Sequence, residues 1–443
     1  MEYGIISLVP VLVVIVTAII TKRSIEPLVL GGIVGFVILG GKGFVLDYLD
    51  AIYIELGKSG YFVIVFALFG VFVKLISEAE AINGFSNFII KFAKTKKQAG
   101  VFSVIIAFVM FLDNFFSVLS AGIASRDITD NAKISREMLT FTLQVTACAT
   151  AAIIPASLWG PFMAGNLDAA LGGTTGFETL LKSAPFVLFG IVGPVIVILF
   201  YLKVIPLFGP MKAAELRAEN GQVSPYPEEE KSEGHDNSKD SILNFILPLG
   251  ILVAVTLYFS ELLYGLLAGT VVAMILYVAK GILKPGRAFD ILPEGFMDMV
   301  PATMIVLSAF ILQQANDALG MAPFIIENVE PLLNWAVLPA ITFLLVMALA
   351  FVTGSYWGMM AISCPLILPL ALALDANLYL TIGALISGGA AGAAACFYGD
   401  SATLACGITK IKNIDFARTA LPLFIPIIVV VFVLYLILGF TVR

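Results

Sequence analysis

Apolar runs that are long enough to cross a lipid bilayer follow one another along most of this chain. A helix needs about 20 residues to span about 30 Å of hydrocarbon. Five runs lie near residues 4–21, 26–41, 60–77, 136–154 and 183–204, and five more lie near 243–260, 262–280, 299–315, 375–397 and 420–440. Because backbone groups in a bilayer have to pair within the protein, these runs predict helices. The expected fold class is an all-α polytopic membrane protein.

The composition agrees with a membrane protein and argues against several other classes. Of the 443 residues, 60% are hydrophobic and 13% are charged, which is too few charges to cover a soluble surface of this size. The net charge of −6, with much of the acid in one loop, gives no sign of a nucleic-acid partner. The one histidine, His235, lies in that loop and no HExxH motif occurs, so an enzyme is not expected. The four cysteines lack the spacing of metal ligands and are interpreted as packing thiols.

A polar stretch at residues 206–241 divides the chain into two membrane repeats, residues 1–205 and residues 242–443. The stretch is charged and lacks periodicity, which predicts a flexible cytoplasmic linker, and a plain tether is favoured over a regulatory segment. Three segments recur in the same order in both halves, which suggests an internal duplication. Residues 66–89 parallel 306–325, residues 111–122 parallel 351–362, and residues 153–165 parallel 395–407.

Two further apolar segments, 99–125 and 338–366, decide the topology because each has a polar, helix-breaking centre. Each segment either spans the membrane once or forms a re-entrant hairpin that returns to the side from which it came. The hairpin arrangement puts nearly all clusters of lysine and arginine on one face, as the positive-inside rule requires of the cytoplasmic face. It leaves five transmembrane helices in each half, an odd number, so the two repeats are expected to be inverted relative to each other.

Four interruptions of the apolar pattern are expected to converge near the middle of the bilayer. They are the two hairpin centres and a break in the helix that follows each hairpin, and irregular backbone at this depth needs protein or a water-filled cavity around it. A carboxylate in hydrocarbon is costly, so Asp113 and Asp400 predict a site that holds Na⁺ or H⁺. The candidate cation and proton ligands are Asp113, Asn114, Ser117, Ser157, Thr353, Gly354, Ser355, Gly399, Asp400, Ser401 and Thr403.

Simpler roles for these residues stay open from the sequence. Asp113 also suits a helix cap, and Asp400 suits a turn after glycine. The hydroxyl side chains also suit hydrogen bonds to helix carbonyls, and the two glycines suit backbone geometry. Four aromatic residues at the interruptions either line a substrate cavity or pack the broken helices. They are Trp159, Tyr356, Trp357 and Tyr398.

Short motifs at the interruptions resemble a known transporter family. The motifs are FLDNFFS (111–117), IPASLWG (154–160), FVTGSYWGMMAISCPLILP (351–369) and YGDSATL (398–404). Together they resemble the NhaC-type sodium/proton antiporter family of the ion-transporter superfamily. The resemblance implies Na⁺ binding at Asp113 and Asp400. The chain departs from the family pattern at Asn114, where the family has a second aspartate, and at Ser401, where the family has a histidine.

These observations predict a cation-coupled secondary active transporter with alternating access, and a Na⁺/H⁺ antiporter of the NhaC type is favoured. A Na⁺- or H⁺-coupled carrier of an organic solute, such as an amino acid or a carboxylate, stays open because few titratable groups lie in the core. A channel is disfavoured because polar residues gather at the breaks instead of forming a continuous stripe. The expected location is the plasma (inner) membrane. The expected partners are lipid, Na⁺ and H⁺, with no other cofactor, while a small organic solute and a homodimer are left open.

Overall fold

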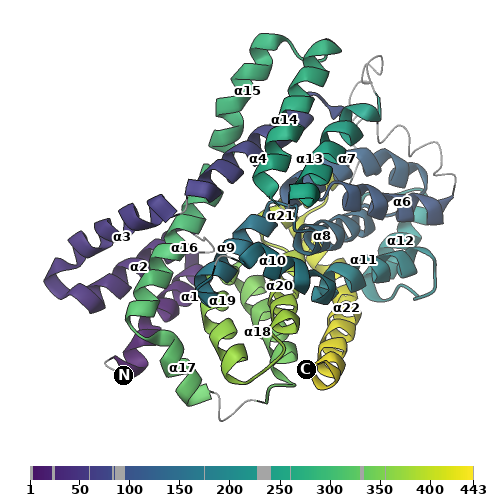
Figure 1. The fold of residues 1–443 in the computed structure, drawn as a ribbon. Coiled ribbons are helices and arrows are strands. Elements are labelled where there is room, and N and C mark those ends of the chain that lie inside the picture. The colour runs from purple at the N-terminus through teal and green to yellow at the C-terminus, as the bar shows by residue number, and fades with distance from the viewer. Residues whose placement is uncertain are drawn as a thin grey trace.

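The computed structural model describes residues 3–21, 25–58, 60–81, 84, 95–173, 175–226, 241–259, 261–329, 334–354 and 356–442 (Figure 1). Every regular element in these ranges is helical, so the all-α fold class is confirmed there. The first half forms η1 (Gly4–Leu8), α1 (Val9–Thr21), α2 (Ile25–Gly40), η2 (Gly41–Gly43), α3 (Phe44–Lys58), α4 (Gly60–Glu78), α6 (Lys96–Val109), α7 (Asn114–Asn131), α8 (Arg136–Ile153), α9 (Trp159–Leu171), α10 (Gly176–Ser183), η3 (Ala184–Phe186), α11 (Leu188–Tyr201) and α12 (Gly209–Glu219). The second half forms α13 (Leu243–Phe259), α14 (Leu262–Ala279), α15 (Pro285–Asp298), α16 (Val300–Ala318), α17 (Met321–Val329), α18 (Leu338–Thr353), α19 (Tyr356–Ala373), α20 (Leu378–Ala395), α21 (Asp400–Thr409) and α22 (Asn413–Thr441).

Several of these helices are long and apolar enough to cross a membrane. In the described ranges there are seven such segments, Ile25–Gly57, Gly176–Tyr201, Leu262–Ala279, Pro285–Ala318, Tyr356–Ala373, Leu378–Ala395 and Asn413–Thr441. Shorter apolar helices cover Gly4–Thr17, Leu243–Thr256 and Leu338–Thr353. A multi-pass membrane protein is therefore confirmed, whereas the number of ten full spans stays a prediction.

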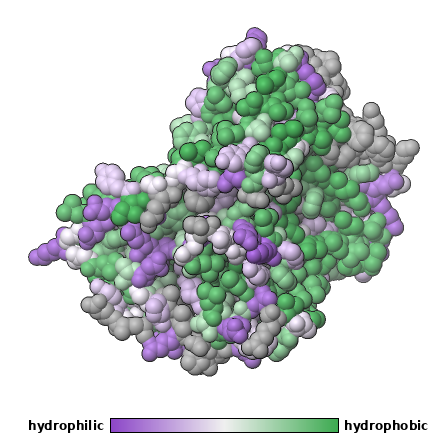
Figure 2. Space-filling model, in the orientation of Figure 1, coloured by the Kyte–Doolittle hydropathy of each residue, from purple (hydrophilic) through white to green (hydrophobic). Residues whose placement is uncertain are grey.

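Large apolar side chains are exposed along single faces of the outer helices. On α22 they recur every three or four residues, at Ile425, Val429, Val433, Ile437 and Phe440, and on α14 at Tyr264, Leu267, Val271 and Ile275. Figure 2 shows apolar residues over a broad part of the visible surface. A soluble protein rarely exposes apolar patches of this extent, whereas a bilayer covers them.

Most of the helices form two bundles. A frame bundle combines α1–α4 with α13–α16, and a hairpin bundle combines α6–α11 with α18–α22; Figure 1 shows α2, α3 and α15 extending away from the central α8 and α20. A contact between a helix of the first half and a helix of the second half is matched by a contact between the equivalent helices of the opposite halves. Helix α2 packs on α16 as α14 packs on α4, α7 packs on α21 as α19 packs on α9, and α11 packs on α20 as α22 packs on α8. This reciprocity supports the internal duplication that the sequence suggests.

Both predicted hairpins return to the point where they begin. Glu215 accepts a hydrogen bond from the backbone N–H of Ser135 (2.7 Å), just beyond α7, and forms an ion pair with Lys96 at the start of α6 (2.8 Å). One side chain can reach both positions only if α6 and α7 fold back on each other. The start of α18 and the end of α19 likewise share an apolar cluster that includes Leu338 and Leu370.

Each helix break is tied by hydrogen bonds to the tip of the preceding hairpin. The backbone N–H of Leu158, between α8 and α9, donates to the carbonyl of Leu112 (2.8 Å). The hydroxyl of Tyr398, between α20 and α21, donates to the carbonyls of Phe351 (2.8 Å) and Val352 (2.9 Å) at the end of α18. Backbone groups freed where a helix is interrupted need such partners. Tip and break therefore form one unit in each half.

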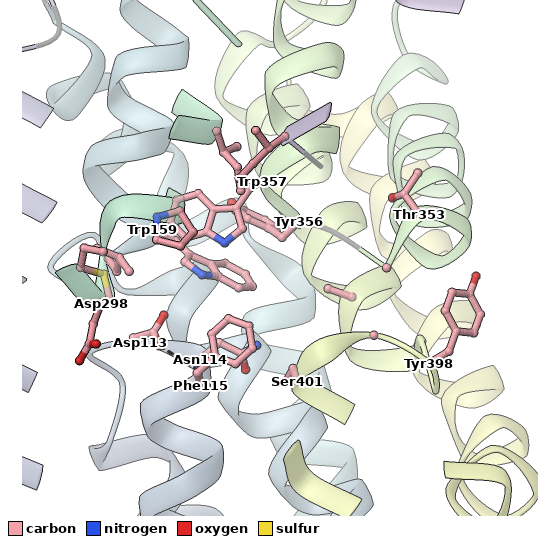
Figure 3. Close-up of a pocket in the computed structure, with 18 of the residues that line it drawn as sticks. Asp113, Asn114, Phe115, Trp159, Asp298, Thr353, Tyr356, Trp357, Tyr398 and Ser401 are labelled. Atoms are coloured by element: carbon pink, nitrogen blue, oxygen red, sulfur yellow. Dashed lines mark hydrogen bonds between the residues drawn. The ribbon is translucent and has the colours of Figure 1, made fainter. Parts of the chain in front are cut away.

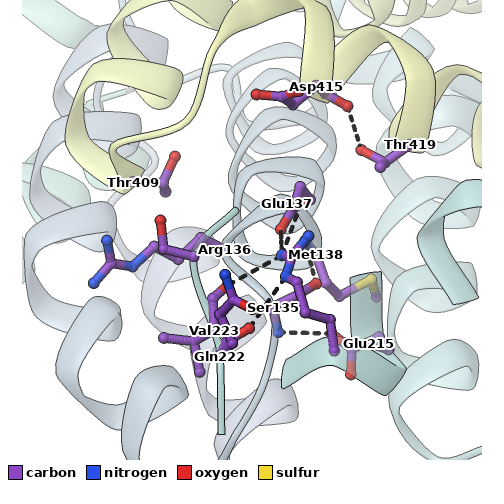
Figure 4. Close-up of polar contacts among 12 residues, drawn as sticks. Ser135, Arg136, Glu137, Met138, Glu215, Gln222, Val223, Thr409, Asp415 and Thr419 are labelled. Atoms are coloured by element: carbon purple, nitrogen blue, oxygen red, sulfur yellow. Dashed lines mark hydrogen bonds and ion pairs between the residues drawn. The ribbon is translucent and has the colours of Figure 1, made fainter. Parts of the chain in front are cut away.

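Part of the presumed tether is ordered and docked on the membrane helices. Residues 209–226, called the strap below, include α12 and run across the starts of α8 and α22 (Figure 4). Arg217 forms an ion pair with the buried Glu137 (2.7 Å), and the Tyr226 hydroxyl donates to Asp415 (2.6 Å). The strap is therefore ordered where the sequence suggested a flexible tether, because side chains such as Arg217 and Tyr226 bind groups on the membrane helices. Residues 227–240, with His235, lie outside the described ranges.

Candidate functional site

A cavity of about 600 Å³ lies between the frame bundle and the hairpin bundle, and all four interruptions contribute to its wall (Figure 3). The hairpin bundle supplies Asp113, Asn114, Phe115, Leu158, Trp159, Thr353, Gly354, Tyr356, Trp357, Ala393, Tyr398, Gly399 and Ser401. The frame bundle supplies Thr21, Ile25, Glu26, Asp298, Met299, Pro301 and Ile305. The predicted convergence of the two hairpin tips and the two breaks is thus seen in the described residues.

Asp113 is the N-cap of α7 and also faces the cavity. Its Oδ2 accepts hydrogen bonds from the backbone N–H groups of Phe115 (2.9 Å) and Phe116 (3.2 Å), and the residue is 6% exposed. An aspartate cap satisfies N–H groups that the first helical turn leaves unpaired. Both bonds end on the same oxygen, so the cap and a ligand for Oδ1 are compatible. The simpler role that the sequence left open is therefore real, and it does not exclude binding.

Two polar contacts lie near the cavity, and one of them joins the two halves of the chain. Asn114 is buried, and its Oδ1 accepts a weak hydrogen bond from the Cys148 thiol (3.5 Å). The Gln144 amide of α8 donates to the hydroxyl of Ser401, which lines the cavity (3.0 Å), and that hydroxyl also lies 3.3 Å from the amide oxygen. Gln144, which is fully buried, was not predicted as a site residue. The signal in the sequence is a glutamine within the apolar run of α8.

The aromatic residues form a stacked wall between the repeats. Trp159 of the first half stacks on Tyr356 of the second half, with ring centroids 3.7 Å apart and planes 14° apart. Trp357 meets Phe162 edge-on at 4.7 Å. The buried hydroxyl of Tyr356 has no hydrogen-bond partner among the described residues. Packing and cavity lining, the two alternatives left open above, are therefore both features of these side chains.

Glycine is required at the second hairpin tip. Gly354 has φ +69°, a left-handed conformation that L side chains rarely adopt, and it ends α18. A Cβ there would lie 3.4 Å from the Cys396 sulfur and 3.5 Å from Cα of Gly399, so the tip and the following break are in close contact. The neighbouring Thr353 hydroxyl donates to the carbonyl of Leu349 (2.8 Å), as threonine in a helix commonly does.

Three predicted ligands serve the local backbone or lie away from the cavity. The hydroxyl of Ser117 donates to the Ala107 carbonyl (3.0 Å) and joins the two arms of the first hairpin. Ser157 donates to the Ala151 carbonyl (2.6 Å) and accepts from the backbone N–H of Trp159 (3.2 Å), which closes the break. Thr403 accepts from Asn413 (2.9 Å) and lies two residues after Ser401, on the other side of α21. Their side chains therefore do not line the cavity.

Ser355 and the side chain of Asp400 lie outside what the structure describes. The backbone at Asp400 starts α21, and its neighbours Gly399 and Ser401 both line the cavity. Whether the two aspartates face each other thus stays a prediction.

Two cavity carboxylates come from the frame bundle and were not predicted. Glu26 starts α2, and Asp298 ends α15. Lys74 forms an ion pair with Asp298 (3.1 Å) instead of with Glu78, the partner that the i, i+4 spacing allows. The sequence signal for Glu26 and Asp298 is weak, because acidic residues are common where an apolar run ends near water. The described lining residues include three carboxylates and no basic side chain, and although Lys74 neutralises Asp298 from outside the lining, the remaining negative charge favours a cation.

The described residues contain no cluster of three or more His, Cys, Asp or Glu side chains suited to a tightly held metal ion. The available oxygen donors are those of one buried carboxylate, an amide, a hydroxyl and the backbone carbonyls at the breaks. Hard oxygen ligands of this kind suit an alkali cation that binds and leaves.

Sequence comparison supports a membrane transporter. Residues 241–440 match the family described as the Na⁺/H⁺ antiporter family, which confirms the resemblance drawn from the motifs. Over its whole length the chain resembles an uncharacterized protein of Haemophilus influenzae, at 24% identity across 98% of this chain and 91% of that protein.

Solved structures of transporters share the fold. The YdaH transporter of Alcanivorax borkumensis superposes with a TM-score of 0.65 at 11% identity, over 91% of this chain and 90% of that one. MtrF of Neisseria gonorrhoeae, described as illuminating a class of antimetabolite efflux pumps, superposes with a TM-score of 0.59 at 11% identity, over 90% and 85%. The chain therefore shares its fold with two solved transporters, and its second half matches the Na⁺/H⁺ antiporter family.

Proposed function

We propose that the chain is a cation-coupled secondary transporter in which Asp113 binds the coupling ion. The observation that carries the proposal is a buried carboxylate at a hairpin tip, with Oδ2 used as a helix cap, in a cavity whose described lining has no basic side chain. An isolated carboxylate in such a place needs a counter-charge, and a bound Na⁺ or a proton supplies it. Asn114 Oδ1 and the backbone carbonyls of the breaks complete the proposed oxygen shell.

Na⁺/H⁺ antiport of the NhaC type follows if one site takes either ion. Asp113 cannot hold Na⁺ and a proton together, so binding of one releases the other. Alternating access to opposite sides of the membrane then exchanges them. In this proposal Asp400, at the equivalent place in the second half, forms the second acidic ligand.

A second candidate is a coupled transporter of an organic solute. The cavity of about 600 Å³ is far larger than an unhydrated Na⁺ and falls in the range of pockets for small organic molecules. Trp159, Tyr356 and Trp357 offer flat apolar surfaces to such a solute. The description of MtrF as an efflux pump for antimetabolites also fits this candidate.

We further propose that the halves are inverted repeats in the plasma membrane, with the linker in the cytoplasm. The reciprocal helix contacts support two-fold related halves, and the two returning hairpins support five spans in each. Because the cavity lies between two bundles, movement of the hairpin bundle against the frame bundle would open it to one side and then to the other.

Flux measurements in proteoliposomes test the function. The purified protein is reconstituted with a pH-sensitive dye inside, and an inward or outward Na⁺ gradient is imposed without any organic solute. Antiport predicts Na⁺-driven pH changes that the Asp113→Asn variant lacks. If pH stays constant while a labelled amino acid or carboxylate accumulates on the Na⁺ gradient, the second candidate replaces the first. If neither flux exceeds that of empty liposomes, the proposal fails.

A further inference from the structure

A second cavity, of about 320 Å³, lies far from the site and is rich in lysine. It is formed where α6 begins, where α11 ends and where α12 crosses them, and Figure 1 shows these three helices together. Four lysines line it, Lys96, Lys97, Lys203 and Lys212, and they define the lysine pocket. Its floor is apolar and includes Phe200 and Tyr201. Nothing in the proposed transport cycle uses this pocket.

The pocket carries an excess of positive charge. Lys96 is neutralised by Glu215 (2.8 Å) and Glu219 (3.0 Å), and the hydrogen bond from Lys96 lowers the pKa of Glu219. The other three lysines have no carboxylate within ion-pair distance in the described ranges, although Lys203 is near enough to Glu219 to help lower its pKa. The two glutamates therefore leave more ammonium groups than carboxylates around one cavity, which attracts an anion.

The backbone at the start of α6 disfavours two of these lysines. Lys96 and Lys97 occupy the first turn of α6, where the positive end of the helix dipole disfavours cations. Lys203 has φ +62°, a left-handed conformation in which glycine or asparagine is the usual choice. Lysine at two unfavourable positions at the start of α6, beside an excess of positive charge, points to a role in binding. Lys203 adds only its charge, because it follows the C-terminus of α11, where the helix dipole favours a cation. The same helix end that repels lysine adds to the attraction for an anion.

The surroundings put the pocket at the edge of the bilayer. The candidate span Gly176–Tyr201 ends at the pocket. Directly beside the lysines, large apolar side chains are exposed: Leu202 (38%), Val204 (66%), Phe208 (40%) and Leu216 (52%). Basic residues next to exposed apolar ones at the end of a span are the pattern of a segment that lies at headgroup level.

We propose that the lysine pocket binds the phosphate headgroup of an anionic phospholipid, whose acyl chains lie along the exposed apolar residues. Lysine ammonium groups bind phosphate oxygens as charged hydrogen-bond donors. Because α12 forms one wall, a bound headgroup would also join the strap to α6 and α11. The ligand is thus a structural lipid at the membrane surface, distinct from the transported ion or solute.

Lipid titration of the purified full-length chain tests the proposal. Phosphatidylglycerol or phosphatidylcholine is added in mixed micelles, and binding is followed by native mass spectrometry and by the thermal unfolding temperature. We expect phosphatidylglycerol to bind and to raise that temperature, and phosphatidylcholine to do neither. Each lysine beside an anionic headgroup contributes roughly fivefold in affinity, so Lys97→Gln/Lys203→Gln/Lys212→Gln should weaken binding by about 100-fold.

Matched variants distinguish binding at the lysine pocket from nonspecific attraction of the lipid by positive charge elsewhere on the protein. Lys42→Gln/Lys182→Gln/Lys284→Gln removes the same charge at exposed positions elsewhere and should bind phosphatidylglycerol like the wild type. The Lys→Arg triple variant of the pocket should keep most of the affinity. Equal binding by the pocket variant, or equal loss in the control variant, would overturn the proposal. A stabilisation of the same size by inorganic phosphate alone would show a soluble anion to be the ligand and would also overturn it.

Discussion

At Asp113 a single carboxylate combines a structural and a chemical task. Its Oδ2 holds the first turn of α7, and this bond fixes the side chain at the edge of the cavity. A ligand held by its own helix pays little entropy on binding because it is already in position. The charge and the cap can be separated by substitution, since asparagine caps a helix about as well as aspartate does.

Asp113→Asn should abolish cation-coupled flux while the protein stays folded. The amide oxygen keeps the cap, so the free energy of unfolding should stay within about 1 kcal/mol of the wild type. The counter-charge for Na⁺ or H⁺ is lost, so flux in proteoliposomes should fall to that of empty liposomes. Asp47→Asn, which removes an exposed carboxylate on α3, is the control and should transport normally. Wild-type flux in Asp113→Asn would remove this residue from the mechanism.

Ser401→Ala should destabilise the protein through Gln144. The buried amide of Gln144 loses its hydrogen-bond partner, at a cost of about 1–3 kcal/mol. Gln144→Leu/Ser401→Ala leaves no unpaired polar group and should recover most of that loss. Thermal unfolding of the purified variants measures both effects. If the double variant is less stable than the two single losses added together, the pair is not the source of the cost.

The sequence predicts which polar positions lie near the cavity but not which way each side chain points, and the ligand roles of these residues stay predictions. Asp113 and Asn114 stand out because burial makes polar groups costly. Ser117 and Thr403 looked equivalent to them, yet their side chains point to a neighbouring arm or to another helix. The direction of each side chain depends on how the helices pack, which the linear pattern does not contain.

At the level of helices, the interruptions were predictable and the strap was not. Glycine, proline and adjacent polar residues end helices for local reasons, so the hairpin tips and breaks were visible in the sequence. The strap binds through charged side chains, such as Arg217 on Glu137, that look solvated when read alone. Its order depends on partners more than 70 residues away, for example the 80-residue separation of that pair.

Arg217→Met should destabilise the protein because the buried carboxylate of Glu137 loses its ion-pair partner. The Glu137 side chain is 3% exposed, and removal of one partner of a buried ion pair costs about 3 kcal/mol. Glu137→Gln/Arg217→Met removes both charges and should restore part of the stability in thermal unfolding. Deletion of residues 228–238 keeps every described strap contact and should leave stability and transport unchanged. An Arg217→Met variant as stable as the wild type would mean that the strap is not held by this pair.

At the scale of the whole molecule, the cavity lies where two bundles meet and where two similar halves meet. The frame bundle supplies Glu26 and Asp298, and the hairpin bundle supplies Asp113 and the aromatic wall. A site shared by two bodies changes its exposure when the bodies move, whereas a site inside one body does not. This division favours alternating access over a fixed pore.

The direction in which each half crosses the membrane follows from the hairpins and can be tested with single cysteines. If both hairpins re-enter, cysteines at Lys97, Lys133 and Lys284 face the cytoplasm, and cysteines at Lys42 and Lys182 face the opposite side. A membrane-impermeant maleimide should then label the first three in inside-out vesicles and the last two in right-side-out vesicles. The native cysteines Cys148, Cys364, Cys396 and Cys406 are buried and should give little background.

The pair Lys97 and Lys133 is the most informative, because it brackets the first hairpin. The shared contacts of Glu215 with Lys96 and Ser135 put the two ends of that hairpin side by side, so both cysteines should react from one face. Labelling from opposite faces would mean that residues 99–125 cross the membrane. The first half would then have an even number of crossings, both halves would start from the same side of the membrane, and the inverted-repeat mechanism would have to be abandoned.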